Sequence, residues 1–232
     1  MPYILSPLIT EDSESMWFEE SAYSKKSIYS IVPGIVPPVN YDQHIINSHS
    51  LTHIEAPRHV SNDGKTVDEY FGTDHFFGGC TVVKLAGNNY KVIGDGIYHW
   101  VVSLSELQSA LKNKIPKKLI LSTQMYPKNN DGYHDPNYVL TLGQEAADWL
   151  ISSKDFNFYG TSWKSSDYTP GSTERPIHKT LFKQAVIAEC LDLEAVPSGD
   201  YFIVAYPLRI KDSSESPVTP VLFTYDELKE IL

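Results

Sequence analysis

The stretch LTLGQEAADWLISSKDFNFYGT, residues 140–161, carries the pattern that decides the fold class. Thr141 and Gln144 have the spacing of a capping box at a helix N-terminus. Apolar residues at helical spacing follow this box; they are Leu142, Ala146, Trp149 and Leu150. The run FNFYGT, residues 156–161, is the next expected strand. We therefore expect a helix followed directly by a strand.

Units of the same kind flank this stretch. Ser103 and Glu106 form a second capping-box pattern before a helix whose apolar face holds Leu104, Leu107 and Leu111. The run KLILST, residues 118–123, predicts a buried strand, as do the runs at 80–85, 185–193 and 201–210. Thr224 and Glu227 cap a short final helix.

Alternating helices and strands in the middle of the chain indicate an α/β protein. The first forty residues are rich in serine and proline, and we expect loops with short strands there. No internal repeat or linker divides the sequence, which predicts a single domain over residues 1–232.

Composition excludes several classes of function. The 232 residues are 41% apolar and 21% charged, so a substantial core can be buried. The formal net charge of −10 disfavours a nucleic-acid partner. An apolar run of about 18 residues, which a membrane span needs, is absent, and the N-terminus does not resemble a signal peptide. Cys80 and Cys190 are distant in sequence, and we expect two reduced thiols in the cytoplasm.

The segment HSLTHIEAPRH, residues 49–59, carries the chemistry. Four of the eight histidines, at positions 44, 49, 53 and 59, fall within sixteen residues, where chance would place about half of one. On an extended chain His49, His53, Glu55 and His59 would all point to one side. Pro57 argues against a helix.

Two of these histidines need a bend in the chain to meet. In a flat strand His49 and His53 would lie roughly 13 Å apart, whereas a metal–nitrogen bond is about 2 Å long. We therefore expect a bend near residues 50–52. Imidazole and carboxylate ligands suit Zn²⁺ or Mn²⁺. Three ligands leave a position for water, whose pKa the ion lowers so that it can attack a carbonyl carbon. The alternative is a set of surface or core histidines without metal.

The segment resembles the signature HxGTHxDxPxH of the cyclase-like metal-dependent hydrolases, which include bacterial kynurenine formamidase and isatin hydrolase. The stretches YFGTDHFFGGCTVVKL, ERPIHKTLFKQAVIAECLDL and SGDYFIVAYPLRI are also similar to the family, and the likeness runs roughly from Tyr3 to Phe223. It implies a swivelling β/β/α domain, with a mixed sheet and packed helices, assembled as a homodimer or homotetramer that binds a small-molecule substrate.

The resemblance also implies roles for individual residues. His49, His53 and Glu55 would hold the first metal ion. His59 and Glu189 would hold a second ion where two are bound, with Glu55 bridging. His178 would be the general acid/base, with His59 beside it in the catalytic set.

Two positions depart from the family pattern. Leu51 replaces its glycine, so the bend has to use ordinary backbone angles. Glu55 replaces its aspartate, and the added methylene favours one ion over two. Asp167, in the turn SSDY, and Trp17, next to Phe18, are candidates for binding substrate. The alternatives are a plain turn for Asp167 and ordinary packing for Trp17.

The sequence thus predicts an amidohydrolase that acts on C–N bonds other than peptide bonds, of the arylformamidase kind. Two alternatives remain open. One is a cyclase or lyase in biosynthesis. The other is a small-molecule binding protein with a degenerate site, as Leu51 and Glu55 could also indicate.

Overall fold

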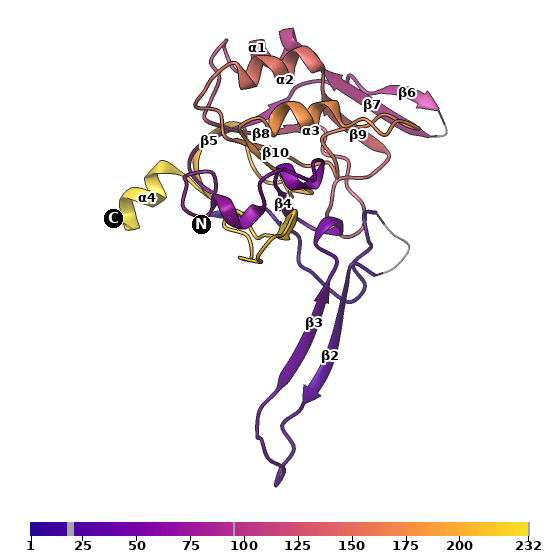
Figure 1. Ribbon diagram of the computed structural model, residues 1–232, viewed down its shortest axis with the longest axis vertical. Helices are drawn as coiled ribbons and strands as arrows, with labels where there is room; N and C mark the ends of the chain where they lie inside the picture. The colour runs from indigo at the N-terminus through magenta and orange to yellow at the C-terminus, as the bar shows by residue number, and fades with distance from the viewer. Residues whose placement is uncertain (18–20, 95, 232) are drawn as a thin grey trace.

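A mixed β-sheet forms the centre of the protein (Figure 1). The computed structural model describes residues 1–17, 21–94 and 96–231, and within them nine strands form this sheet. In spatial order they are β1 (Tyr3–Ile4), β14 (Val221–Phe223), β12 (Gly199–Val204), β5 (Phe77–Leu85), β8 (Lys118–Thr123), β10 (Phe158–Thr161), β11 (Val186–Glu189), β4 (His53–Glu55) and β13 (Glu215–Pro217). The central strands β5, β8, β10 and β11 are parallel to one another, and the flanking pairs are antiparallel.

Three helices cover one face of the sheet, at the top of Figure 1. They are α1 (Leu104–Ala110), α2 (Gln144–Ile151) and α3 (Pro176–Leu181). A three-stranded sheet of β6 (Lys91–Gly94), β7 (Ile97–Val102) and β9 (Tyr138–Leu142) lies beside them. The last helix, α4 (Tyr225–Ile231), lies near the N-terminus, outside these layers. The expected α/β class with a mixed sheet and packed helices is confirmed.

The side chains of strand β8 are buried on both faces of the sheet. Leu119 and Leu121 belong to the core under the helices, whereas Ile120 belongs to the core on the opposite face. This alternation follows from the two-residue period of a strand. All six residues of β8 are buried, which explains why Leu119, Ile120 and Leu121 are consecutive apolar residues rather than alternating with polar ones.

Two of the three expected capping boxes are confirmed. In α1 the Ser103 hydroxyl accepts from the Glu106 amide at 3.3 Å, and Glu106 accepts from the Ser103 amide at 2.8 Å. Thr224 and Glu227 form the same exchange, at 3.2 Å and 2.9 Å, before α4.

The third capping box is wrong. Thr141 lies inside β9, where its hydroxyl is 2.8 Å from His99 Nε2, and the residue before α2 is Gly143. Strand β9 pairs with β7 through Thr141 and Val101, so tertiary pairing overrides the local cap preference.

Several predicted boundaries shift. The strand expected at 185–193 ends at Glu189, because Cys190 has a φ of +58° and turns the chain. The strand expected at 201–210 is β12, Gly199–Val204. Helix α3 was not expected; it is only six residues long and begins at Pro176.

The first forty residues, where we expect loops with short strands, contain β1 and one strand of a long hairpin. Strands β2 (Tyr23–Tyr29) and β3 (Tyr41–Ile46) pair with each other and project away from the rest of the protein (Figure 1). The sequence of β2, YSKKSIY, shows no apolar–polar alternation because six of its seven residues are exposed. Among the described residues, no helix is long and apolar enough to cross a membrane. The extent of the single domain stays a prediction.

Gly160 offers a test of the central packing. A Cβ atom there would lie 2.9 Å from both Ile120 Cγ1 and Leu191 Cδ1, two fully buried side chains. Gly160→Ala should lower the free energy of unfolding by about 1–3 kcal/mol, because an overpacked core has to shift. Urea denaturation measures the change.

Gly72→Ala is the matched control, since no atom lies within 4 Å of the added Cβ. Equal stability of the two variants would contradict the packing described at Gly160.

Candidate metal centre

The backbone brings the histidines of the 49–59 segment together through two short 3₁₀ helices. One covers Ser48–Ser50, strand β4 follows, and the second covers Pro57–His59. Leu51 has a φ of −124° and a ψ of −175°, which is ordinary extended backbone. The turn thus lies just before Leu51, and the rings of His49 and His53 have centroids 4.8 Å apart.

The carboxylate of Glu55 is the centre of the cluster. Its Oε1 lies 2.9 Å from His49 Nε2, 3.3 Å from His53 Nε2 and 3.2 Å from His59 Nε2. Its Oε2 lies 3.1 Å from His178 Nε2. Glu55 is fully buried, in a strand with β11 on one side and β13 on the other.

A second buried carboxylate comes from β11. The antiparallel pairing of β11 with β4 sets Glu189 opposite His53. Glu189 Oε1 accepts a hydrogen bond from Ser166 Oγ at 2.8 Å and lies 3.4 Å from His178 Nε2. Its Oε2 is buried and has no hydrogen-bond partner. A buried carboxylate oxygen without a partner is costly.

These side chains form two sets of potential ligand atoms, and Glu55 belongs to both. The first set is His49, His53, Glu55 and Glu189, and the second is Glu55, His59 and His178. Within each set the atoms lie within 4.8 Å of one another. The distances therefore put Glu189 with His49 and His53, whereas the family resemblance pairs it with His59.

The donor set fits a divalent cation. Two buried carboxylates and several imidazoles converge, and the unpartnered Glu189 Oε2 is a free ligand atom. His53 Nδ1 lies 2.7 Å from the Leu51 carbonyl oxygen, to which it can donate. That bond leaves His53 Nε2, which faces Glu55 Oε1 at 3.3 Å, as the potential ligand atom, the usual arrangement around a metal-binding histidine.

The electrostatics of the cluster favour charged groups in spite of burial. Burial by itself would raise the pKa of Glu55. The hydrogen bond and the positive charge of His178, together with hydrogen bonds from His49 and His53, instead hold that pKa well below its usual range. Burial would lower the pKa of His178, but hydrogen bonds to Asp167, Glu189 and Glu55 raise it well above normal. The site thus stabilises positive charge beside Glu55.

Asp167 holds His178 in place. Its Oδ2 lies 2.7 Å from His178 Nδ1, and its two oxygens accept from the backbone amides of Ile177 and His178 at 3.0 Å and 2.9 Å. The carboxylate thereby fixes both the first turn of α3 and the orientation of the imidazole. His178 Nε2 points to Glu55 and Glu189.

Glu215 was not found from the sequence. It lies on β13, directly opposite Glu55 on β4, and its Oε2 is 3.7 Å from His59 Nδ1. The neighbouring His59 imidazole lowers the pKa of Glu215 to about 2. The three-residue strand ESP carries no motif, so only the pairing register reveals the contact.

Trp17 covers one edge of the cluster. Its ring stacks on His49 with centroids 5.2 Å apart, and Lys164 Nζ lies 4.4 Å from the ring centroid. Phe18, the other expected aromatic residue, lies outside the described residues.

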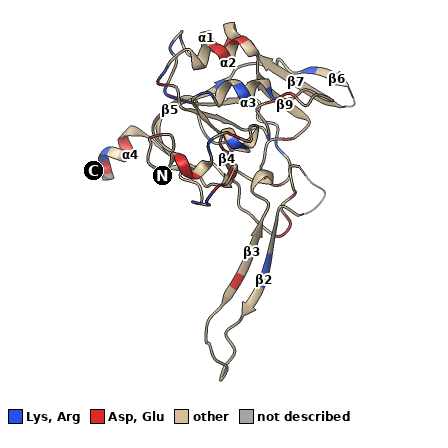
Figure 2. Cartoon of the chain, viewed as in Figure 1, with Lys and Arg blue, Asp and Glu red and all other residues tan. Residues whose placement is uncertain are grey.

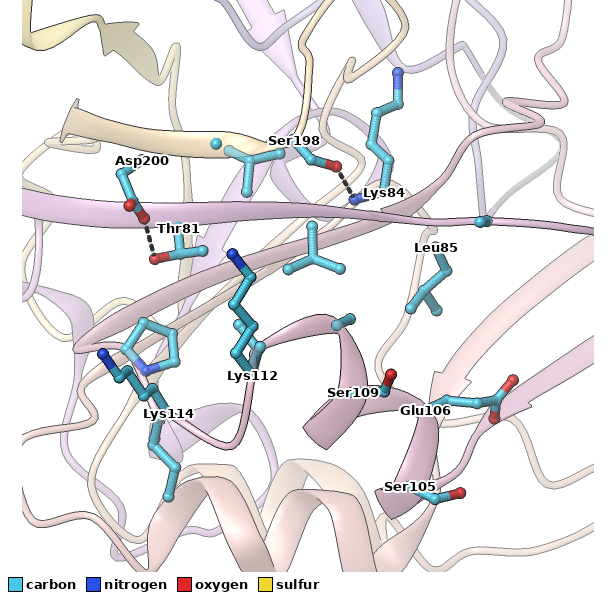
Figure 3. Close-up of a pocket in the computed structure, with 18 of the residues that line it drawn as sticks. Thr81, Lys84, Leu85, Ser105, Glu106, Ser109, Lys112, Lys114, Ser198 and Asp200 are labelled. Carbon is cyan, nitrogen blue, oxygen red and sulfur yellow. Dashed lines mark hydrogen bonds between the residues drawn. The ribbon is translucent and has the colours of Figure 1, made fainter.

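Access to the cluster is from the side of His49 and His59. Their side chains are 22% and 19% exposed, whereas those of His53 and Glu55 are fully buried. A cavity of about 1110 Å³ lies elsewhere, between α1 and strands β5 and β12 (Figure 3). None of the cluster residues lines that cavity.

Fold and site together define an α/β protein with a buried histidine–carboxylate centre suited to a divalent metal ion. A model of the Cyclase family, described as "Putative cyclase", matches residues 5–168. This chain belongs to that family, and the expected resemblance is confirmed.

Relatives and solved structures agree with this assignment. The chain is 26% identical over 219 residues to a kynurenine formamidase of Polaromonas naphthalenivorans (strain CJ2), covering 94% of this chain and 88% of the relative. It is 28% identical over 197 residues to that of Bacillus anthracis, covering 79% and 80%.

Two solved structures share the fold. A predicted metal-dependent hydrolase from Bacillus stearothermophilus has a TM-score of 0.72 and 22% identity, over 96% of this chain and 97% of that one. Isatin hydrolase A from Labrenzia aggregata has a TM-score of 0.69 and 18% identity, over 97% and 94%.

Replacing Glu55 tests the metal centre. Glu55→Ala removes the carboxylate shared by both ligand sets, so the purified variant should retain less than about a tenth of the wild-type metal, as expected when a ligand is lost. Elemental analysis after equilibration with Zn²⁺ or Mn²⁺ measures this. His44→Ala is the control, because His44 is exposed on β3. Full metal content in Glu55→Ala would refute the centre.

Removing the metal should lower the melting temperature. A ligand at about 100 times its Kd stabilises the folded state by about 2.7 kcal/mol, and each kcal/mol shifts Tm by about 2–4 °C at this chain length. We therefore expect a chelator to lower the Tm of the wild type by about 5–10 °C and to leave Glu55→Ala unchanged. A wild-type Tm insensitive to the chelator would count against a bound ion. Calorimetry with and without added Zn²⁺ or Mn²⁺ measures both.

Proposed function

We propose that this protein is a metal-dependent amidohydrolase that cleaves a formamide, a cyclic amide or a related carbonyl bond, with N-formyl aromatic amines as the leading substrate class. One observation carries the proposal: an Asp167–His178 pair, held at 2.7 Å, directs an imidazole nitrogen at the buried carboxylates of the metal centre. The kynurenine formamidase relatives, which align over most of the chain, support it.

Zn²⁺ and Mn²⁺ are the ions we propose, because mixed imidazole and carboxylate ligands suit both. His49, His53, Glu55 and Glu189 would hold one ion, and His59 would hold a second together with the shared Glu55 where two are bound. Such an ion, when bound, polarises a carbonyl group and lowers the pKa of water.

His178 would move the proton. Its Nδ1–H can donate to Asp167 Oδ2, which leaves Nε2 as the proton-accepting atom on the side of the centre. That nitrogen can take a proton from water and return it to the leaving amine, the two transfers that amide hydrolysis requires. Asp167 acts through His178 and is a positioning residue.

Trp17 and His59 have the remaining proposed roles in the site. We place the aromatic part of the substrate near Trp17, which stacks on the more exposed ligand His49. His59 would complete the catalytic set, with Glu215 behind its ring. Free, buried Cys80 and Cys190 suit a reducing compartment, so we propose that the protein acts in the cytoplasm.

His178→Ala tests the reaction. We expect the variant to retain metal. Its kcat for N-formyl aromatic amines should fall by a factor of about 10²–10⁴, because it lacks the general acid/base. Release of formate and the product mass measure the reaction, and hydrolysis adds one water to the substrate. His44→Ala should remain active. Full activity in His178→Ala, or a wild-type product with no added water, would refute the proposal.

Asp167→Asn tests whether Asp167 acts on the His178 imidazole or only supports helix α3. Asp167 raises the pKa of His178, and a base must be deprotonated to act. The acidic limb of the kcat–pH profile should therefore move to lower pH in this variant, with reduced kcat. An unshifted limb would mean that Asp167 supports only helix α3.

A further inference from the structure

The cavity between α1 and strands β5 and β12 is a recess separate from the metal centre (Figure 3). Its volume is about 1110 Å³, and none of the metal-centre residues lines it. Sites for small molecules are concave, with mostly apolar walls and a few polar groups that orient the ligand. This cavity has walls of both kinds, and their side chains define the ligand that it fits.

One side of the cavity is apolar. It is lined by Val83 and Leu85 from β5, Trp100 from β7 and Leu111 at the end of α1. All four side chains belong to the core under the helices and are at most 7% exposed. The cavity therefore reaches the edge of the hydrophobic core, where the apolar part of a ligand would be removed from water.

Three charged groups of the cavity already have partners. Asp200 Oδ1 accepts from the Thr81 hydroxyl at 2.7 Å, and Glu106 accepts from the Ser103 amide at 2.8 Å as the capping residue of α1. Lys84 Nζ donates to two backbone carbonyl oxygens, at 2.8 Å and 2.9 Å. These contacts hold the three groups in place, so a ligand has to be bound by other side chains of the cavity.

Lys112 and Lys114 supply positive charge that has no partner in the described part of the chain. Both line the cavity, whereas nearby Lys117 pairs with Asp74. Figure 3 shows the Lys112 side chain extending from the end of α1 towards β5. Residues 111–118 include four lysines and no acidic residue, in a chain with a formal net charge of −10 (Figure 2). Positive charge is thus concentrated beside an apolar wall.

Lys112 stands where glycine is usual at the end of a helix. The Asn113 amide donates to the Gln108 carbonyl oxygen at 2.8 Å, and the Lys112 amide donates to that of Ser109 at 3.2 Å. These are the two bonds of a Schellman motif. Lys112 has a φ of +51°, in the left-handed region that disfavours residues with a Cβ atom. The lysine strains this turn, and a role for its side chain explains why the position is not glycine.

We propose that this cavity binds a small organic carboxylate with an aromatic body. The carboxylate accepts hydrogen bonds from Lys112 and Lys114. The aromatic ring lies against Leu85, Trp100 and Leu111. Three lysines and two carboxylates line the cavity, and one carboxylate of the ligand neutralises their net charge of +1. The inference is independent of the proposed reaction, because the cavity contains no residue of the metal centre.

Calorimetry with 1-naphthylacetate, and with 1-naphthylacetamide as its uncharged counterpart, tests the proposal. We expect the carboxylate to bind once per chain. The amide should bind at least about 10-fold more weakly, because hydrogen bonds between charged groups are the stronger ones. Equal affinity for the two compounds, or no saturation up to about 10 mM carboxylate, would overturn the proposal.

Amide chemical shifts locate the bound carboxylate and distinguish the cavity from the metal centre, which also attracts carboxylates when it holds an ion. In ¹⁵N-labelled protein loaded with Zn²⁺, titration with 1-naphthylacetate should move the signals of residues 81–85 and 105–115. Movement confined to residues 49–59 and 178–189 would place the ligand at the metal centre and refute a site in the cavity.

Lys112→Gly tests the side chain without harm to the turn. Glycine suits the left-handed position, so the variant should keep or raise the wild-type Tm, while it binds 1-naphthylacetate about 10-fold more weakly. Lys114→Gln, which lies outside the left-handed turn, should weaken binding to a similar degree. Lys154→Gln is the control, because Lys154 is exposed and does not line the cavity. An unchanged Kd in either cavity variant, or the same loss in the control, would contradict the assignment.

Discussion

A buried carboxylate shared by four imidazoles is the interaction on which this site depends. Glu55 cannot remain ionised at a fully buried position of the sheet without compensation, because burial of an isolated charge costs several kcal/mol. His49, His53, His59 and His178 supply that compensation from four places in the backbone. The sheet is therefore organised around a charge that hydrophobic packing alone would exclude.

The sequence revealed the site residues of the 49–59 segment but only some of those that lie far from it in the chain. His49, His53, Glu55 and His59 are recognisable because they lie within eleven residues at spacings that one bent strand can gather. His178 and Glu189 lie 123 and 134 positions beyond Glu55, and only the family resemblance linked them to the motif. Glu215 had no signal, since its contact with His59 arises from the register between β13 and β4.

The same limit applies to the fold. Strand β8 was predicted with its observed bounds because both of its faces are buried, so its sequence has the consecutive apolar residues Leu119, Ile120 and Leu121. Helix α1 was predicted because a capping box is a local interaction. Short strands were expected in the first forty residues, but the bounds of the hairpin strand β2 were not predicted, because neither local capping nor burial shapes its sequence. Thr141 was misassigned because pairing with β7 is not visible locally. Structure that depends on neighbouring residues in the sequence could be predicted. Structure that depends on pairing with distant strands could not.

Leu51 and Glu55, the two departures from the family pattern, have a joint physical explanation. Leu51 is fully buried and packs in a small cluster with Met16, Ala22 and Tyr133, while the chain turns in the preceding 3₁₀ helix. The position therefore contributes packing where glycine would contribute only freedom of the backbone. The longer side chain of Glu55 still places both oxygens within 3.3 Å of imidazole nitrogens. A buried leucine directly after the turn and a glutamate that reaches all four imidazoles fit an intact centre, which argues against a degenerate site.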